Sequence, residues 1–394
     1  MPSRRAFLAA VSTGVAGGLA GCIDGASGDG APSPGSDGST EWPVRNYDRF
    51  GTAYASDAAV PRSGPSERFS TPLDGTPRGR PVLAGGRVFQ STWAGIETFD
   101  AESGERLWTF RETDDEGASY YTSPAVHDGI AYLGTESGLV AVDAENGEEQ
   151  WRVETDGRVS ASPVPGIEWG ALYAGSDRGE VLRISPDGDV EWRTSVYGEV
   201  THLVSAQMAG VTAATSGGEL FTLYDGRGLW RQKVPGKVTA VAGRSGNDLF
   251  VATFGGGVLC LPTAAHAGRV AWHAENGPVA DGALVLADGA VFGGDLSGVD
   301  RLDADDGSRG WELGDDTYSV AAAGDTLYTG ADGAVVARPL SGGTGVGSAR
   351  VNAERFRYGI GEEASAMGVT PADGALFAGV TDRGDGEERL IALE

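Results

Sequence analysis

Short runs of alternating apolar and polar residues dominate the chain, and residues with turn chemistry separate them. Residues 119–153 show the pattern with runs at Pro124–Val126, Ile130–Gly134, Leu139–Asp143 and Glu149–Val153. The joints contain Asp-Gly, Ser-Gly and Asn-Gly pairs, and Gly and Asn accept the positive φ of tight hairpin turns. The pattern predicts four antiparallel strands. Because so small a sheet cannot bury its own faces, it needs neighbouring copies of itself.

A tryptophan in the last strand marks each copy. Successive tryptophans are 43, 41, 38, 42 and 39 residues apart, at Trp108, Trp151, Trp192, Trp230, Trp272 and Trp311. Four-stranded units that repeat every ~40–45 residues are the signature of β-propeller blades. Phe69 lies 39 residues before Trp108, in the strand-like run Glu67–Thr71. We therefore expect Phe69 to take the tryptophan position of one further outer strand.

The two ends of the repeat array complement each other. Residues 317–351 fit a degenerate unit whose last strand is Ser348–Val351, and residues 363–393 supply three strands without a fourth. The strand around Phe69 has no blade of its own. Pairing it with the last three strands closes the ring and removes free sheet edges.

These features predict an all-β fold, an eight-bladed β-propeller of four-stranded antiparallel blades closed by an N-terminal strand. The propeller spans residues 42–394, and its closing strand lies within residues 67–74. Residues 41–65 lack strand periodicity. We expect them to pack across the ring and cover part of one face or the channel mouth.

The N-terminal residues are typical of an export and anchoring device. Arg4 and Arg5 precede a mildly apolar run in residues 1–21, as in a twin-arginine signal. This run ends in a lipobox-like sequence at Cys22, which predicts that Cys22 carries lipid. Residues 22–41 are rich in Gly, Ser, Asp and Pro and predict a flexible tether. The alternative is a secreted soluble protein with an incidental cysteine.

The charge of the chain indicates in which environment the protein works and which partners it is expected to bind. The chain has 56 acidic and 30 basic residues, and Lys233 and Lys237 are its only lysines. Strong acidity with few lysines is typical of proteins in concentrated salt, where hydrated carboxylates keep the net charge high. An acidic face for a cationic partner is the alternative. No basic stripe is visible, so we expect no nucleic-acid partner.

A motif recurs in register and carries a family resemblance. The pattern Asp-Ala-x-x-Gly leading to Trp appears at Asp100–Trp108, Asp143–Trp151 and Asp303–Trp311, and Ser123–Gly134 precedes the second copy. It resembles the pyrroloquinoline-quinone-like propeller repeat. The resemblance implies eight blades with Phe69 and the six tryptophans docking between sheets. It also implies two kinds of relative: quinoprotein dehydrogenases, and non-catalytic lipoproteins such as the outer-membrane assembly factor propeller. Haloarchaeal surface proteins look similar as well.

The chemistry of the dehydrogenase relatives is missing from the sequence. Those enzymes carry a vicinal cysteine pair and a calcium site, whereas this chain has only Cys22 and Cys260. Cys260 lies in an apolar run, which favours a small buried side chain over a reactive thiol. The histidines, His127, His202, His266 and His273, show no metal-ligand spacing. We expect no catalytic residue, metal or cofactor, with pyrroloquinoline quinone and calcium as the alternative.

One weaker set of binding candidates remains. The residues that open the innermost strands should ring the channel mouth, and they are Arg80, Tyr120, Arg158, His202, Lys237, Tyr318 and Glu362. Basic and aromatic side chains there contrast with the acidic surface and could receive a ligand or an acidic peptide. The alternative is that they only line a hydrated channel.

The sequence thus predicts a non-catalytic, lipid-anchored binding or scaffold module on the outer face of the cytoplasmic membrane. We expect it to be exported folded, to be a monomer, and to bind other surface or envelope proteins. A divergent quinone-dependent dehydrogenase and a glycan-binding surface module remain the alternatives.

Overall fold

The computed structural model describes residues 40–112, 120, 122–206, 210–244, 248–263, 269–279, 282–314, 316–347, 349–384 and 386–394. All of them belong to one compact unit. The predicted export signal with Arg4 and Arg5, Cys22, nearly all of the predicted tether, and His266 lie outside the described residues. Helix in the described part is limited to a 3-10 turn, Ile167–Trp169. None of the described helical structure is long and apolar enough to cross a membrane.

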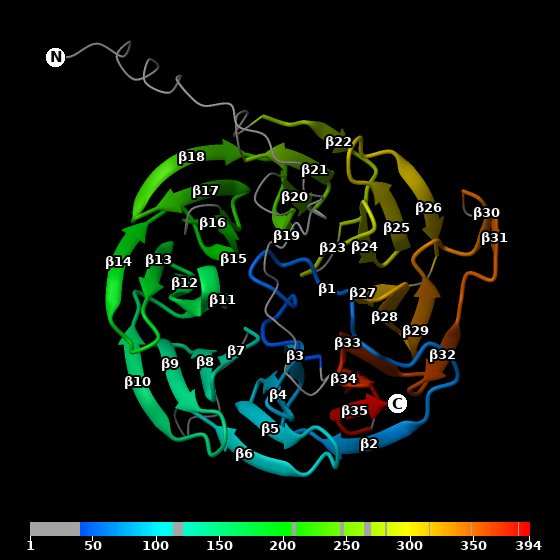
Figure 1. Cartoon of the computed structure of the whole chain (residues 1–394), viewed down its shortest axis with the longest axis horizontal. Helices are drawn as coiled ribbons and strands as arrows, with labels where there is room; N and C mark the ends of the chain where they lie inside the picture. Colours follow the sequence, from blue (N-terminus) through cyan, green and yellow to red (C-terminus); the bar gives the residue numbers. More distant parts are fainter. Residues whose placement is uncertain are drawn as a thin grey trace, which may run out of the picture. The chain divides into compact units, whose positions relative to one another are not determined.

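Eight sheets of antiparallel strands stand around a central channel (Figure 1). The strands of the first four blades run from the channel outwards. Blade one is β3 (Pro77–Ala84), β4 (Arg87–Thr92), β5 (Ile96–Asp100) and β6 (Arg106–Phe110). Blade two is β7 (Ala125–His127), β8 (Ile130–Gly134), β9 (Gly138–Asp143) and β10 (Glu149–Glu154). Blade three is β11 (Val159–Pro165), β12 (Leu172–Ser176), β13 (Glu180–Ile184) and β14 (Val190–Ser195). Blade four is β15 (Val200–Ala206), β16 (Gly210–Thr215), β17 (Glu219–Tyr224) and β18 (Arg227–Lys233).

The remaining blades follow the same order. Blade five is β19 (Val238–Arg244), β20 (Asp248–Thr253), β21 (Gly257–Pro262) and β22 (Trp272–Ala274). Blade six is β23 (Val285–Ala287), β24 (Ala290–Asp295), β25 (Gly298–Asp303) and β26 (Arg309–Leu313). Blade seven is β27 (Thr317–Ala323), β28 (Thr326–Ala331), β29 (Ala334–Pro339) and β32 (Phe356–Gly359). Blade eight is β33 (Ala364–Ala372), β34 (Ala375–Asp382), β35 (Arg389–Leu393) and β2 (Glu67–Pro72).

The closing strand predicted from the sequence is confirmed. β2 pairs antiparallel with β35, with Phe69 opposite Ala392 and Ser70 opposite Ile391. Ser66 and Glu394 extend the ladder through two backbone hydrogen bonds of 2.8 and 2.9 Å. The first blade-forming strand in the chain therefore completes the last blade, and the ring has no open seam at that point.

The predicted outer strand of blade seven is wrong. Ala349–Val351 (β31) instead pairs with Thr344–Val346 (β30) as a separate, largely exposed ribbon, and Ser348 lies outside the described residues. The outer strand is β32, because Phe356 can bury its ring against Tyr328, at 6.4 Å between ring centroids. Residues 349–351 offer no aromatic side chain for that position.

Aromatic side chains join each blade to the next. The Trp108 indole Nε1 donates to Ala144 O in blade two at 3.2 Å, and the ring covers Gly147. Gly147 has φ of 77°, and a Cβ there would lie 2.8 Å from the indole. The Asp-Ala-x-x-Gly turn thus needs glycine for both its backbone angle and the close approach of the neighbouring ring.

The same docking recurs around the ring. In five further turns, a glycine lies beneath an aromatic ring of the preceding blade. These contacts are Gly104 with Phe69, Gly188 with Trp151, Gly226 with Trp192, Gly307 with Trp272, and Gly342 with Trp311. Trp230 packs in the cluster of apolar residues between blades four and five. Aromatic docking therefore acts at successive blade interfaces and not in one central core.

Residues 42–55, which we call the plug segment, run across the channel (Figure 1). Trp42 exchanges backbone hydrogen bonds with Leu83 of blade one, and Tyr54–Ala55 (β1) pairs parallel with β27 of blade seven. Between these ends, plug carbonyls accept backbone bonds from blades two, four, five and six, through Val126, Ser205, Gly243 and Leu286. The segment without strand periodicity therefore occupies the channel by pairing with the innermost strands.

Candidate functional site

The two faces of the ring differ in what they carry. The innermost strands begin on one face, which we call the connection face because it holds the blade-to-blade connections and the turns between second and third strands. They end on the opposite face, where the plug segment lies, and we call this the plug face. The chain reaches the plug face at Thr40 and Glu41, which accept hydrogen bonds from Asp373 N at 3.0 Å and Gly85 N at 2.9 Å.

Arg80 crosses the channel close to the plug segment. Its side chain is 4% exposed, and its guanidinium donates to the carbonyls of Val369 and Val320, the latter at 2.7 Å. The guanidinium carbon lies 5.5 Å from the centre of the Trp42 ring. Burial, and secondarily the Arg45 cation, lower the pKa of Arg80 to about 9. Arg80 therefore links blades one, seven and eight and fills part of the channel with positive charge.

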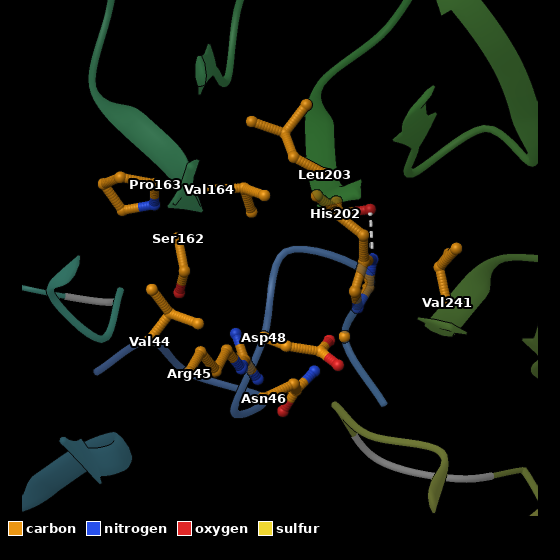
Figure 2. Close-up of a pocket in the computed structure, with 12 residues that line it drawn as sticks. Val44, Arg45, Asn46, Asp48, Ser162, Pro163, Val164, His202, Leu203 and Val241 are labelled. Atoms are coloured by element: carbon orange, nitrogen blue, oxygen red, sulfur yellow. Dashed lines mark hydrogen bonds between the residues drawn. The ribbon is translucent and has the colours of Figure 1, made fainter. Parts of the chain in front are cut away.

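A small cavity of about 30 Å³ lies between the plug segment and blades three to five (Figure 2). Its walls come from both parts and consist of Val44, Arg45, Asn46, Asp48, Gly51, Ser162, Pro163, Val164, Thr201, His202, Leu203 and Val241. A space of this size accommodates water, whereas small-molecule sites usually measure several hundred cubic ångströms, roughly 300–1,000 Å³. The cavity is therefore too small for an organic cofactor.

Asp48 is the carboxylate that lines this cavity. Its Oδ1 accepts the backbone N–H of Phe50 and Thr52 at 2.9 and 3.1 Å, and its Oδ2 accepts the Thr52 hydroxyl at 2.7 Å. Burial raises the pKa of Asp48, while these bonds act in the opposite direction. Both oxygens shape the plug turn, which leaves Asp48 poorly placed to act as a metal ligand or a general base.

His202 faces the same cavity from blade four. Its Nδ1 lies 3.0 Å from the Thr201 hydroxyl (Figure 2). Burial lowers the pKa of His202 to about 3, and the Arg45 and Lys237 cations add to this effect. The imidazole is therefore neutral near pH 7, and its charge is not available to bind an anion.

The seven candidate rim residues do not share one environment. Arg80 and His202 lie in the channel, and Tyr120 is buried with its hydroxyl accepting from Glu112 N. The others lie at the connection face, with Arg158 3.7 Å from Asp177, Tyr318 2.8 Å from Arg383, and Lys237 and Glu362 exposed. Sequence position alone places them at the strand starts, but the side chains point to different places.

The connection face also carries apolar side chains that the sequence analysis missed. Trp93 is 48% exposed, Tyr197 79%, Phe254 68% and Leu296 64%. Trp93 and Phe254 occupy the same turn position in their blades, and their backbone N–H groups donate to Thr76 O and Lys237 O at 3.1 and 2.8 Å. Comparing that turn position between repeats would have revealed Trp93, Phe254 and Leu296, whereas Tyr197 lies in a blade-to-blade connection.

The described residues of the channel do not fit pyrroloquinoline quinone with calcium. They contain no group of three side chains of the His, Cys, Asp or Glu type placed to hold a metal ion. Trp42 and Arg80 occupy space in the channel, and both oxygens of Asp48 are already bonded. Cys260 is a buried free cysteine, and burial raises the pKa of its thiol to about 12, so it is not a reactive thiolate.

An eight-bladed ring with docked aromatic residues and recurring Asp-Ala-x-x-Gly turns defines the class, a propeller of pyrroloquinoline-quinone-like repeats. The family model described as outer membrane protein assembly factor BamB matches residues 34–152, 136–224 and 217–373. The chain belongs to this family. No curated protein matches the chain.

Solved structures share the fold at low sequence identity. BamB from Moraxella catarrhalis is 17% identical, with a TM-score of 0.61 over 84% of this chain and 98% of its own. The computationally designed Ika8 protein is 15% identical, with a TM-score of 0.64 over 82% and 98%. Quinohemoprotein alcohol dehydrogenase ADHIIG from Pseudomonas putida HK5 is 12% identical, with a TM-score of 0.65 over 90% and 80%. These likenesses concern the fold alone.

Proposed function

We propose that this chain is a non-catalytic binding or scaffold module that holds envelope proteins through its turns. The observation that supports this most strongly is the plugged channel, because the backbone of the plug segment and the Arg80 side chain occupy the place where the dehydrogenase relatives hold their quinone. Family membership agrees with an assembly role. The binding surface then consists of the exposed loops on the ring.

The proposal includes a place in the cell. A twin-arginine signal with Arg4 and Arg5 exports the folded chain, and lipid on Cys22 holds it at the outer face of the cytoplasmic membrane through a tether. The acidic composition suits concentrated salt. The proposed module is a monomer and has no nucleic-acid partner.

Fractionation tests the anchor. Replacing Cys22 (Cys22→Ser) removes the lipid acceptor, so the protein should move from the membrane pellet to the soluble extracytoplasmic fraction. The matched control is Cys260→Ser, a change at the buried cysteine that should leave the distribution unchanged. Equal membrane retention of the Cys22 variant and the wild type would contradict lipid anchoring.

Calorimetry separates this proposal from the dehydrogenase alternative. Titrating the protein in high salt with pyrroloquinoline quinone and calcium should release no saturable heat, because the plug segment and Arg80 occupy the channel and its described residues include no group of three placed to hold a metal ion. Saturable binding would overturn the proposal in favour of a quinone enzyme. Binding on a glycan array would instead support a glycan-binding surface module.

A further inference from the structure

The two lysines of the chain and two exposed aromatic residues lie in hydrogen-bonded turns and connections of the connection face. Lys233 ends β18, Lys237 precedes β19, and both belong to the connection between blades four and five. The Phe254 ring is 68% exposed and the Tyr197 side chain 79%. We call these four residues the lysine–aromatic patch.

Hydrogen bonds link the segments that carry the four residues. Phe254 N donates to Lys237 O at 2.8 Å, and the Lys233 ammonium donates to Gly217 O in the neighbouring turn. The turn that contains Gly217 is also bonded to the connection that carries Tyr197, because Ser216 N donates to Glu199 O at 2.9 Å. The patch therefore rests on four segments joined by hydrogen bonds, the two connections and the two turns, which fix the backbone positions of its residues.

The positive charge of the patch is not cancelled by the acids beside it. The Glu219 carboxylate is shared by two cations, Arg231 at 2.8 Å and Lys233 at 3.9 Å. Glu199 lies 3.8 Å from Arg158. In the described structure Lys237 makes no ion pair, and it is exposed. On a chain of net charge −26, this region is set to attract acidic groups.

The aromatic side chains of the patch provide apolar contact area beside the positive charge of the lysines. Large exposed aromatic residues bury much area on binding and are enriched where binding energy concentrates. Phe254 and Tyr197 make no contribution to the blade-docking positions, which Trp192 and Trp230 occupy in blades three and four. Their exposure is therefore not explained by the packing of the ring.

A protein partner suits the patch better than a membrane surface. The chain enters the ring at the plug face, where Thr40 and Glu41 are bonded, so the connection face lies on the opposite side. This orientation rests on the anchoring proposed above. A net charge of −26 also opposes the approach of the whole module to anionic lipid.

We propose that the lysine–aromatic patch docks a segment of a partner protein in which acidic side chains flank an aliphatic or aromatic one. Lys233 and Lys237 steer and pair with the acidic groups, while Phe254 and Tyr197 cover the apolar side chain.

Peptide selection on the full chain tests this assignment. A random peptide library displayed on phage is selected on the wild type and counter-selected on the double variant Tyr197→Ser/Phe254→Ser. The enriched peptides should carry acidic residues beside an apolar one. By fluorescence anisotropy, the double variant and Lys237→Glu should each weaken their binding about tenfold or more, the loss expected for a central contact of ~1.4 kcal/mol.

A matched surface change controls for general effects. Leu229 is 55% exposed on the outer strand of the same region, and Leu229→Ser should leave peptide binding unchanged. The proposal is overturned if no acidic–apolar sequences are enriched, or if they bind the double variant as well as the wild type. Binding to phosphatidylglycerol vesicles that the same variants abolish would also overturn it, by assigning the patch to lipid. These outcomes do not depend on Cys22. The experiments can therefore contradict the proposed lipid anchor and the proposed peptide-binding patch independently of each other.

Discussion

At the scale of single residues, glycine and aromatic positions carry most of the fold's specificity. A glycine with positive φ in the turn between the third and fourth strands lets the aromatic ring of the preceding blade lie directly on the backbone, as with Gly147 beneath Trp108. Two separate penalties follow from any side chain there, backbone strain and a clash. The glycine and the aromatic residue of the repeat motif are therefore required by the contact between neighbouring blades.

Two alanine substitutions separate these penalties. Gly147→Ala should lower the free energy of unfolding by about 2–4 kcal/mol, since it adds a methyl group 2.8 Å from the indole to the strain of φ 77°. Gly129 has φ of 75°, but a methyl group there would have no neighbour within 4 Å, so Gly129→Ala should cost only about 1–2 kcal/mol. Chemical denaturation measures both. Equal losses of unfolding free energy in the two variants would show that the Trp108 indole moves aside and that its contact with Gly147 is not tight.

His202 gives a residue-scale pH dependence. Its pKa is about 3 in the folded protein, against ~6.5 when unfolded, so the unfolded state takes up the proton first as the pH falls. The contribution of His202 to stability is thus complete above pH ~6.5 and declines toward about 3, with a loss of about 2 kcal/mol by pH ~5. Asp300, whose pKa burial raises to about 6, acts in the opposite direction.

The effect of His202 is measured as the difference in unfolding free energy between the wild type and the His202→Gln variant. We expect the unfolding free energy of His202→Gln to fall less than that of the wild type between pH 7 and pH 5, by about 2 kcal/mol. Asp48, Arg45 and Lys237, which surround the imidazole, are the same in both proteins. Parallel pH profiles would mean that folding does not lower the pKa of the imidazole.

At the scale of elements, two N-terminal pieces complete structures that the repeats leave unfinished. The strand β2 supplies the outer strand of blade eight, and the plug segment satisfies backbone groups of innermost strands that face the channel. Unpaired backbone groups at these places would be exposed to water or to other chains. The repeats therefore depend on the segment that precedes them.

Phe69 tests the closing strand. Its ring is 9% exposed, 6.3 Å from that of Phe377, and covers Gly104, so Phe69→Ala should lower the free energy of unfolding by about 3–5 kcal/mol. Hydrogen exchange should show lost protection along β35 first. The exposed Phe254 is the matched control, and Phe254→Ala should change stability by less than about 0.5 kcal/mol. Intact protection of β35 in the Phe69 variant would contradict the role of β2 as closing strand.

At the scale of the whole molecule, closure turns a repeat array into a ring with two distinct faces. The channel is occupied by backbone and by Arg80, so the exposed chemistry lies on the faces of the ring. The chain carries 56 acidic and 30 basic residues, and its two lysines, Lys233 and Lys237, lie near each other on the connection face, where Phe254 is also exposed.

The sequence by itself determined the blade number, the blade period and the closing strand. These features depend on local alternation, turn residues and a tryptophan repeated at regular spacing, all of which are visible without coordinates. It failed at blade seven, because Phe356 replaces the tryptophan after an inserted ribbon, and only pairing with Tyr328 shows which strand is outermost.

Only the tertiary structure decided what fills the channel and which side chains meet at a face. Arg80 bonds to Val320 and Val369, which are 240 and 289 residues away, and the plug segment meets blades from both halves of the chain. Such contacts exist only after the ring closes, and no local pattern encodes them. The lysine–aromatic patch arises in the same way, because neighbouring blades bring separate turns and connections together.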